Sequence, residues 1–367
     1  MKVLLTGTHF TPAVAVIEEL KKRKNIQIVY VGRKTTMEGD QVISVESTIL
    51  PKLGVKFIPI TTGRLQRNFT ILTLLSLLKI PIGFIQAFFI ILSEKPNVIL
   101  SFGGYVAVPV VIMGWLWSIP IIVHEQTLVS GLANKITALF ADKIAVGYLE
   151  NEFMKNPKAI LTGNPLRKEI LNPKKTLSSD FSRLFQVAKI EKLPVILITG
   201  GNQGSHLINE AVEGCLQRIL RYACVIHQTG DSKYGDYEKL VSTQSDRYIV
   251  KKFIKEGMGT ILSQVDLIVS RAGINTLTES LFFKKPMLVI PLPHIYQNEQ
   301  VRNAKFFERL NQVKILYQNE LNADSLNLEL ESILKDLSKW QKQITDKDLP
   351  VDKSAASKVA IETILLA

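Results

Sequence analysis

The chain has 367 residues, 46% of them hydrophobic, and a formal net charge of +12. It is too long for one typical domain, and its apolar content excludes a wholly disordered chain. A basic balance suggests a polyanionic partner: nucleic acid, an anionic membrane surface or a phosphorylated substrate. RNA-binding signatures, zinc-finger spacings and basic-region heptads are absent from the sequence, which argues against nucleic acid. Two cysteines, Cys215 and Cys224, make neither a disulfide framework nor a zinc spacing and favour a reducing compartment.

Strand-like and helix-like segments alternate over the first ~150 residues, about the length of one domain. This β/α alternation predicts an α/β domain with a parallel sheet. The expected strands are Val3–Thr6, Ile26–Gly32, Val98–Ser101, Ile121–His124, Lys143–Val146 and Ala159–Thr162, with others near Val42–Val45 and Val55–Pro59. The expected helices are Pro12–Lys22, Val106–Trp117 and Leu132–Phe140.

The segment Leu72–Leu92 is apolar and long enough to resemble a membrane span. Its middle is interrupted by Lys79, Pro81, Gly83 and Gln86, and it lies between strands of an otherwise soluble domain. Two interpretations remain once a true span is set aside. One is a buried helix pair with an apolar outer face. The other, which we prefer, is a monotopic membrane patch where Arg64, Arg67 and Lys79 meet anionic headgroups.

After a polar stretch near Asn172–Asp180, the expected linker, the alternation starts again. The expected strands are Val195–Thr199, Ala223–Gln228, Tyr248–Lys251, Val265–Ser270, Met287–Leu292 and Lys314–Tyr317. The expected helices are Leu207–Leu220, Thr260–Ser263, Ile274–Phe283, a segment around Gln300–Phe307, Asp324–Lys339 and Ser354–Leu366. The fold class is therefore α/β, with two Rossmann-like domains facing each other across a cleft.

Glycine-rich turns follow four of the expected strands. They are Gly7-Thr8-His9, Gly103-Gly104-Tyr105, Gly200 to Ser205, and Arg271-Ala272-Gly273. Such turns expose backbone N–H groups and the positive end of a helix dipole, which attract phosphate. One turn alone is weak evidence, because tight turns need glycine anyway. Four turns in two similar domains suggest two diphosphate-bearing ligands, one in each domain. Neither a GxxxxGK[ST] loop nor a GxGxxG fingerprint is present.

Three titratable side chains lie where such ligands are expected. His9, in the first loop, is either a general base or a residue that only positions the turn. Glu125 follows a strand and either acts as a base, orients one, or caps the next helix. Glu279, on the Ile274–Phe283 helix, either binds a ribose diol or is an ordinary solvated glutamate.

Polar side chains near the last of these loops leave similar alternatives. Asn298, Gln300 and Asn303 suit sugar hydroxyls, or else they cap the helix that begins near Gln300. Asp346-Lys347-Asp348 resembles a metal-binding DxD motif, but it lies away from any strand end. We interpret it as solvated surface and expect no metal in the site.

An ordered set of short motifs resembles the MurG family over nearly the whole chain. The motifs are THFTPA (8–13), FGGYVAVP (102–109), HEQ and GLANK (124–135), TGNPLR (162–167), GGNQG (200–204), HQTG (227–230), RAGINTLTE (271–279) and PLPH with NEQVRNA (291–304). The family transfers N-acetylglucosamine from UDP-GlcNAc to undecaprenyl-diphosphate-MurNAc-pentapeptide, turning lipid I into lipid II. This step of peptidoglycan synthesis serves cell-wall biogenesis, cell shape and cell division.

The resemblance implies a glycosyltransferase B fold with two roles. The N-terminal domain, residues 1–163 with the closing helix 354–367, would bind the acceptor through Thr8, Gly103, Gly104 and Tyr105. Residues 164–350 would bind the UDP-sugar. The resemblance also implies an inverting enzyme with His9 or Glu125 as the base, no cofactor and no essential metal. It would act as a peripheral protein on the cytoplasmic face of the cell membrane, with a polyprenyl-diphosphate lipid as acceptor.

The resemblance assigns donor contacts residue by residue. Phe253 and Ile254 would meet the uracil, Glu279 the ribose hydroxyls, and Gln300, with Glu299 beside it, the sugar. The diphosphate and ribose would lie near Arg167, Gly201, Asn202, Ala272 and Gly273.

Four positions depart from the family pattern. The first loop is TGTH where GGTGGH is usual, Thr127 replaces an asparagine, Asn202 replaces a serine, and Glu299 replaces a histidine. These changes leave other functions open. They are transfer of a UDP-sugar to another lipid such as a diacylglycerol, a UDP-sugar 2-epimerase, or a subunit that binds donor or membrane without turnover.

Overall fold

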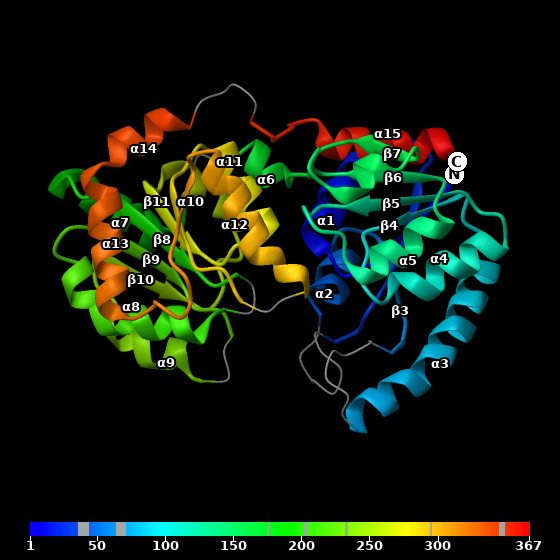
Figure 1. The fold of residues 1–367 in the computed structure, drawn as a ribbon, viewed down its shortest axis with the longest axis horizontal. Helices are drawn as coiled ribbons and strands as arrows, with labels where there is room; N and C mark the ends of the chain where they lie inside the picture. The colour runs from blue at the N-terminus through cyan, green and yellow to red at the C-terminus, as the bar shows by residue number, and fades with distance from the viewer. Residues whose placement is uncertain are drawn as a thin grey trace. The chain divides into compact units, whose positions relative to one another are not determined.

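The structure is a computed structural model that describes residues 1–35, 44–63, 71–174, 176–201, 204–231, 234–293, 296–344 and 349–367. The chain divides into two compact units (Figure 1). Unit 1 comprises Met1–Arg167 and Asp352–Ala367, and unit 2 comprises Lys168–Val351. Arg167, which the sequence places in the C-terminal domain, therefore belongs to unit 1. The polar stretch near Asn172–Asp180 lies inside unit 2, where the Thr260 hydroxyl donates to the Lys174 carbonyl over 2.7 Å.

Unit 1 is built on a seven-stranded sheet in the order β3-β2-β1-β4-β5-β6-β7. Every strand pair in it is parallel. Its strands are β1 (Lys2–Thr6), β2 (Gln27–Gly32), β3 (Lys56–Pro59), β4 (Val98–Ser101), β5 (Ile121–Glu125), β6 (Lys143–Val146) and β7 (Ala159–Leu161). Its helices are α1 (Phe10–Leu20), α2 (Val45–Lys52), α3 (Ile71–Glu94), α4 (Ala107–Leu116), α5 (Leu132–Phe140), the 3-10 turn η1 (Glu152–Lys155) and α15 (Ala355–Leu366).

Alternating residues of the strands serve two cores in unit 1, because successive side chains point to opposite faces of a sheet. Val3 and Leu5 of β1 pack with α1 and with Val359 of α15. Leu4 of the same strand packs with residues of α3, α4 and α5 on the other face. The closing helix thus belongs to the core of the unit where the chain begins.

Unit 2 repeats the plan with a six-stranded parallel sheet in the order β10-β9-β8-β11-β12-β13. Its strands are β8 (Val195–Thr199), β9 (Cys224–Gln228), β10 (Tyr248–Lys251), β11 (Leu267–Ser270), β12 (Met287–Val289) and β13 (Val313–Ile315). Its helices are α6 (Lys168–Leu171), α7 (Ser179–Glu191), α8 (His206–Ile219), α9 (Asp236–Leu240), α10 (Met258–Gln264), α11 (Ile274–Phe282), α12 (Glu299–Arg309), α13 (Ala323–Lys335) and α14 (Leu337–Gln343), with 3-10 turns η2 (Val241–Thr243) and η3 (Tyr296–Asn298).

The strand order reverses direction once in each sheet. In unit 1 the reversal lies between β1 and β4, and in unit 2 it lies between β8 and β11. Ligands of open α/β sheets bind at the carboxyl ends of the strands beside such a switch point. The four glycine turns predicted from the sequence follow these four strands, so each unit carries one pair of turns at its own switch point.

One interpretation and one expectation about unit 1 are wrong. The interpretation of Leu72–Leu92 as a buried helix pair, which was not the preferred one, is wrong because the segment lies in a single helix, α3, which continues through Pro81. The preferred interpretation, a monotopic membrane patch, stays a prediction. A strand was expected near Val42–Val45, but Val45 is the first residue of α2, while residues 42 and 43 lie outside the described part of the chain. Ser44 accepts a hydrogen bond from the Ser47 N–H and so caps this helix, a signal that the β-branched residues around it obscure.

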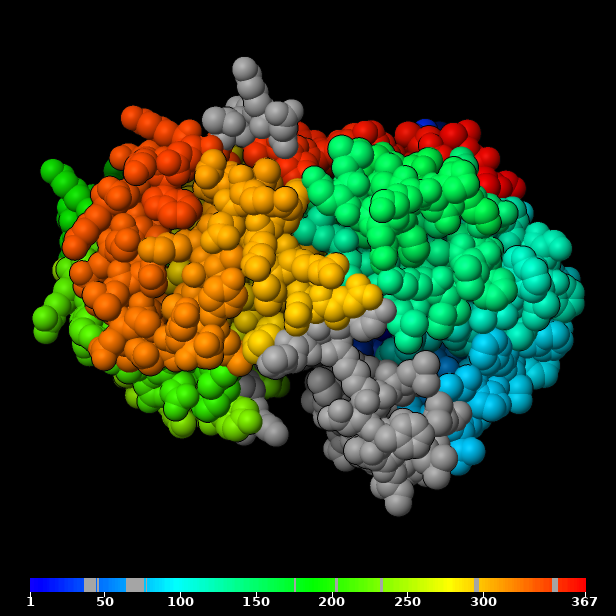
Figure 2. Space-filling model, in the orientation of Figure 1, coloured from blue at the N-terminus to red at the C-terminus, as the bar shows by residue number. Residues whose placement is uncertain are grey.

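Helix α3 presents large apolar side chains to solvent at the surface of unit 1 (Figure 2, light blue). In the part of the chain that the structure describes, no helix is long and apolar enough to cross a membrane. Helix α3 packs on α4, which in turn packs on α5, and these two also expose apolar residues. We call this area the apolar surface: Leu78, Ile82, Ile85, Phe89, Leu92, Trp115, Leu116, Trp117 and Leu139.

Candidate functional site

The two loops at the switch point of unit 1 are packed against each other. The Thr8 N–H donates to the Gly103 carbonyl over 3.0 Å, and the Tyr30 hydroxyl holds the Gly7 carbonyl at 3.0 Å. A side chain at Gly104 would collide with Thr8, and one at Gly103 would collide with Asn134. Glycine is therefore required at both positions by close packing and also by positive φ angles, 72° at Gly103 and 83° at Gly104.

His9 stands at the start of α1 beside this pair of loops, half-buried, and its side chain does not cap the helix. Burial and then the nearby Arg33 guanidinium lower the pKa of His9 to about 4. The imidazole is consequently neutral at pH 7 and has a nitrogen lone pair available for a proton. Arg33 is itself held by Glu46, with Nε 3.2 Å from the carboxylate.

Glu125 organises the loop between β5 and α5. One carboxylate oxygen accepts from the N–H and the hydroxyl of Thr127, over 3.0 and 2.8 Å. The other accepts from the Gly131 N–H at 3.3 Å and from Asn134 Nδ2 at 2.7 Å. Burial raises the pKa of this carboxyl group, against the opposing effect of these hydrogen bonds. Because the side chain is 1% exposed and Gly131 is the N-cap of α5, the geometry favours the helix-capping role over that of a base.

The switch point of unit 2 has open backbone on both of its loops. A side-chain carbon added at Gly201, after β8, or at Gly273, after β11, would meet nothing within 4 Å. Gly201 also has a φ of 81°, which a residue with a side chain rarely adopts. Gly273 is the N-cap of α11, so its neighbourhood carries the positive end of that helix dipole. A ligand phosphate can approach the main chain closely at both places. Asn202 lies outside the described residues.

Arg271, in the loop after β11, connects this loop to the loop after β8 and to the chain just past β12. Its guanidinium donates to the Ser205 hydroxyl over 2.7 Å and to the Ile290 carbonyl over 3.0 Å. Burial lowers the pKa of Arg271 to about 10, so the group stays charged at neutral pH. Next to it, Asn303 of α12 donates to the Ala272 carbonyl over 3.2 Å. Asn303 therefore holds the loop after β11 and does not cap α12.

The remaining donor candidates lie on α11 and around α12. Glu279 is 7% exposed, so the alternative of an ordinary solvated glutamate is wrong. Gln300 accepts a hydrogen bond from the Leu292 N–H over 2.9 Å, which holds the loop after β12 against the first turn of α12. Asn298 is the N-cap of α12 but makes no side-chain cap hydrogen bond.

Gln228 was missed as a site residue by the sequence analysis. At the carboxyl end of β9 its side-chain amide contacts Thr199, Gly201 and Ile254. The HQTG motif contained the signal, since it places Gln228 at the last position of an expected strand. Phe253, 41% exposed, stands beside Ile254 on the loop after β10.

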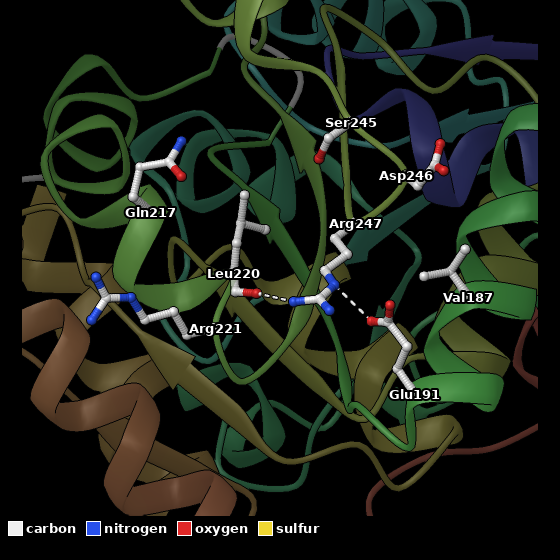
Figure 3. Close-up of a pocket in the computed structure, with 8 residues that line it drawn as sticks. All are labelled: Val187, Glu191, Gln217, Leu220, Arg221, Ser245, Asp246 and Arg247. Carbon is white, nitrogen blue, oxygen red and sulfur yellow. Dashed lines mark hydrogen bonds and ion pairs between the residues drawn. The ribbon is translucent and has the colours of Figure 1, made fainter.

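A surface pocket of ≈ 780 Å³ in unit 2 lies near the amino ends of the strands, away from the glycine turns at their carboxyl ends (Figure 3). Its lining residues Leu220, Arg221 and Arg247 precede the amino ends of β9 and β10. There Arg247 donates to the Leu220 carbonyl at 3.0 Å and pairs with Glu191 at 2.6 Å. This pocket is therefore separate from the loops at the carboxyl ends of the strands. Asp346-Lys347-Asp348 lies outside the described residues.

Comparison with known proteins places the chain in a family. The profile of the glycosyltransferase family 28 N-terminal domain matches residues 6–146, and that of the family 28 C-terminal domain matches residues 195–363. A Clostridium kluyveri protein named UDP-N-acetylglucosamine--N-acetylmuramyl-(pentapeptide) pyrophosphoryl-undecaprenol N-acetylglucosamine transferase is 34% identical over 344 residues, 92% of each chain. A Bacillus cereus transferase of the same name, numbered 2, is 34% identical over 373 residues, 99% of this chain and 98% of its own. The chain belongs to the MurG family of glycosyltransferases.

The fold agrees with that family. The crystal structure of Acinetobacter baumannii MurG superimposes with a TM-score of 0.70, covering 99% of both chains at 22% identity. The two parallel-sheet α/β domains are thus those of a glycosyltransferase B fold, and the fold class predicted from the sequence is confirmed. The family resemblance inferred from the ordered motifs is confirmed as well.

Within each unit, several of the predicted site residues lie at the carboxyl ends of the strands, at or beside the switch point. Unit 1 brings together Thr8, His9, Gly103 and Gly104 at the loops after β1 and β4, with Tyr105 following directly. Unit 2 brings Gly201 and Ile254 together through Gln228, and Ala272 and Gly273 through the loop that Asn303 holds. Arg167, half-buried, ends the first stretch of unit 1. The roles of these residues remain predictions.

Proposed function

We propose that this protein transfers N-acetylglucosamine from UDP-GlcNAc to undecaprenyl-diphosphate-MurNAc-pentapeptide, turning lipid I into lipid II for peptidoglycan synthesis. One observation carries the proposal. Relatives whose names state this activity align with the chain over more than nine-tenths of both sequences. The two pairs of glycine turns support it, since each pair lies at a switch point of a parallel sheet, where ligands that carry phosphate commonly bind.

The chemical step we propose is a single in-line displacement. The acceptor hydroxyl oxygen bonds to the anomeric carbon as the bond from that carbon to the UDP oxygen breaks, which inverts the configuration. The hydroxyl proton passes to His9, whose imidazole is neutral at pH 7. A bound acceptor diphosphate would raise the pKa of His9 above about 4, because a nearby negative charge favours the imidazolium. Glu125 then serves as the residue that orders the adjoining loop.

The leaving UDP gains negative charge as the bond breaks. Backbone N–H donors near Gly201 and Gly273, the α11 dipole and the Arg167 guanidinium would stabilise that charge, with no essential metal in the site. Phe253 and Ile254 would contact the uracil, Glu279 the ribose hydroxyls, and Gln300 with Glu299 the sugar. Asn202 would approach the diphosphate.

The acceptor side of the proposal involves the membrane. Thr8, Gly103, Gly104 and Tyr105 would bind the acceptor head, and the apolar surface of α3, α4 and α5 would seat unit 1 on the bilayer. Aromatic and aliphatic side chains there, including Trp115 and Trp117 at 51% and 46% exposure, suit the interface between headgroups and acyl chains. The net charge of +12 supports attraction to an anionic leaflet. We therefore propose a peripheral location on the cytoplasmic face of the membrane.

A panel of donors and acceptors tests this proposal. UDP-GlcNAc, UDP-GalNAc and UDP-glucose are each offered with lipid I or with diacylglycerol, in the presence and absence of a chelator. We expect transfer from UDP-GlcNAc to lipid I, unchanged by the chelator. Transfer only to diacylglycerol would favour the other lipid transferase, and conversion of UDP-GlcNAc without acceptor would favour an epimerase. Donor binding with no transfer to either acceptor would favour a non-catalytic subunit.

A further inference from the structure

Gln228 lies at the carboxyl end of the second strand of the unit 2 sheet. It ends β9, which lies between β8 and β10, and its side chain is 5% exposed. The loop after β8 carries Gly201, and the loop after β10 carries Phe253 and Ile254. The Gln228 side chain therefore lies between the loop after β8 and the loop after β10.

The two ends of the Gln228 amide are committed to different loops. Nε2 donates to the Thr199 hydroxyl at 3.2 Å and to the Gly201 carbonyl at 3.4 Å. Oε1 accepts from the Ile254 N–H at 2.9 Å. The Thr199 hydroxyl in turn accepts from the Gly201 N–H over 3.1 Å, so Gly201 is held through both its N–H and its carbonyl. One planar amide thus connects two backbone segments that belong to separate loops.

The surrounding contacts make this connection rigid. A side chain at Gly204 would collide with the Thr229 carbonyl, so the loops after β8 and β9 touch directly. Asn209 of α8 donates from Nδ2 to the same Thr229 carbonyl over 3.1 Å, and its Oδ1 accepts from His227 Nε2 over 3.0 Å. Thr229 and Gly230 donate from their backbone N–H groups to the Lys251 and Lys252 carbonyls, both over 3.0 Å. These hydrogen bonds fix the backbone around Gln228, so its side chain has little freedom to move.

We propose that Gln228 is a positioning residue that couples the nucleobase end of the donor site to its diphosphate loop. A uridine diphosphate spans both loops, so its affinity depends on their separation being set before it binds. Pre-organisation of this kind raises affinity because less ordering is needed during binding. The inference rests on the proposed function only in taking the ligand to be a uridine diphosphate sugar.

The test compares whole ligand with fragments in Gln228→Met, which keeps the length of the side chain and removes its hydrogen bonds. Isothermal titration with UDP, and ligand-detected NMR with uridine and with inorganic diphosphate, give the three affinities without acceptor or turnover. We expect UDP to bind about tenfold more weakly and each fragment to lose less than about threefold. In a transfer assay the donor KM rises similarly, while the acceptor KM stays at the wild-type value.

Two further variants separate coupling from folding. Thr199→Val removes the acceptor for the Gly201 N–H and for Gln228 Nε2 but leaves the contact to Ile254, so it should also weaken UDP more than uridine. Gln217→Met makes the same substitution on the exposed surface of α8 and should change no affinity. If Gln228→Met does not fold, as judged by its thermal transition, Thr199→Val decides the question.

Two results would overturn the proposal. One is wild-type affinity for UDP in Gln228→Met. The other is an equal loss for UDP and uridine, which would mean that Gln228 acts on the nucleobase loop alone. Neither depends on transfer to lipid I, so a failure of the proposed function is recognised separately: the wild-type protein would bind UDP and still leave lipid I unconverted.

Discussion

At the residue scale, Glu125 accepts four hydrogen bonds and donates none. In Glu125→Gln one carboxylate oxygen becomes an NH₂ group that faces donors. The free energy of unfolding should fall by about 1–3 kcal/mol, because a buried donor is left facing donors. Urea unfolding followed by circular dichroism measures this change. Unchanged stability together with a large loss of turnover would instead support Glu125 as the base.

His9 gives a prediction about pH. A base must be deprotonated to work, and kcat/KM reports the free enzyme. With a pKa of about 4, His9 should leave kcat/KM level above about pH 5 and lower it as pH falls through 4. The kcat profile, which reports the complex, should lose activity at a higher pH because the bound diphosphate stabilises the imidazolium.

Two variants check this pH prediction. Arg33→Gln should move the acid limb of kcat/KM to higher pH, since the guanidinium no longer opposes protonation of His9. His9→Ala should abolish the limb and lower kcat by about 10²–10⁴. Near-full turnover in His9→Ala would show that another group takes the proton.

The sequence predicted many site residues by type but not their partners. A strand followed by HEQ places Glu125 at the edge of the sheet, yet only the fold shows that Thr127, Gly131 and Asn134 saturate its oxygens. Gln228 has the same limitation, because its contacts with Gly201 and Ile254 join loops that are separate in sequence. Such cross-loop hydrogen bonds leave no periodic pattern for sequence analysis to detect.

At the element scale, α3 is the feature that the sequence described least well. Lys79, Pro81 and Gly83 suggested a break, because an interior proline removes one backbone hydrogen bond and its ring clashes with the carbonyl four residues earlier. The structure nevertheless continues α3 through Pro81. The apolar character of the segment was predicted correctly, and side chains such as Ile85 and Phe89, 58% and 60% exposed, show why it is apolar without being core.

The double variant Ile85→Asp, Phe89→Asp tests the apolar surface. Binding to anionic phospholipid vesicles should fall by at least about tenfold, because two apolar contacts are lost and two negative charges are added. The thermal transition should stay in place, since both side chains are exposed. Leu328→Asp on α13 of unit 2, at 66% exposure, is the matched control and should bind as wild type. Wild-type binding of the double variant would exclude this surface as the membrane contact.

At the scale of the whole molecule, the two units share one plan, with a switch point flanked by two glycine turns in each. Periodicity and strand spacing were enough to predict two α/β domains, because most of the parallel strands, such as β4, β5, β8, β9 and β11, are short, fully buried runs. Periodicity and spacing could not predict the order of the strands in each sheet, since that order depends on which strands pair with each other. That order brings β1 next to β4 and β8 next to β11, and so creates both sites.

The closing helix links the end of the chain to the stability of its beginning. Val359 of α15 is fully buried in the core that contains Val3 and Leu5. Val359→Ala should lower the stability of unit 1 by about 1–3 kcal/mol through the cavity it leaves. Hydrogen exchange should show faster opening in β1 and α1 and unchanged exchange in unit 2. Leu365→Ala, on the same helix at 71% exposure, should have no such effect. Equal destabilisation of both units would contradict this assignment of α15.

The most direct measurement of the central claim is the product formed from purified lipid I, UDP-GlcNAc and the wild-type protein in detergent. We predict a lipid carrying one added N-acetylhexosamine in the inverted, β configuration, with one UDP released for each lipid converted, as seen by mass spectrometry and NMR. The product should not form when either substrate is omitted. Release of UDP without a glycosylated lipid, or a product with retained configuration, would contradict the account.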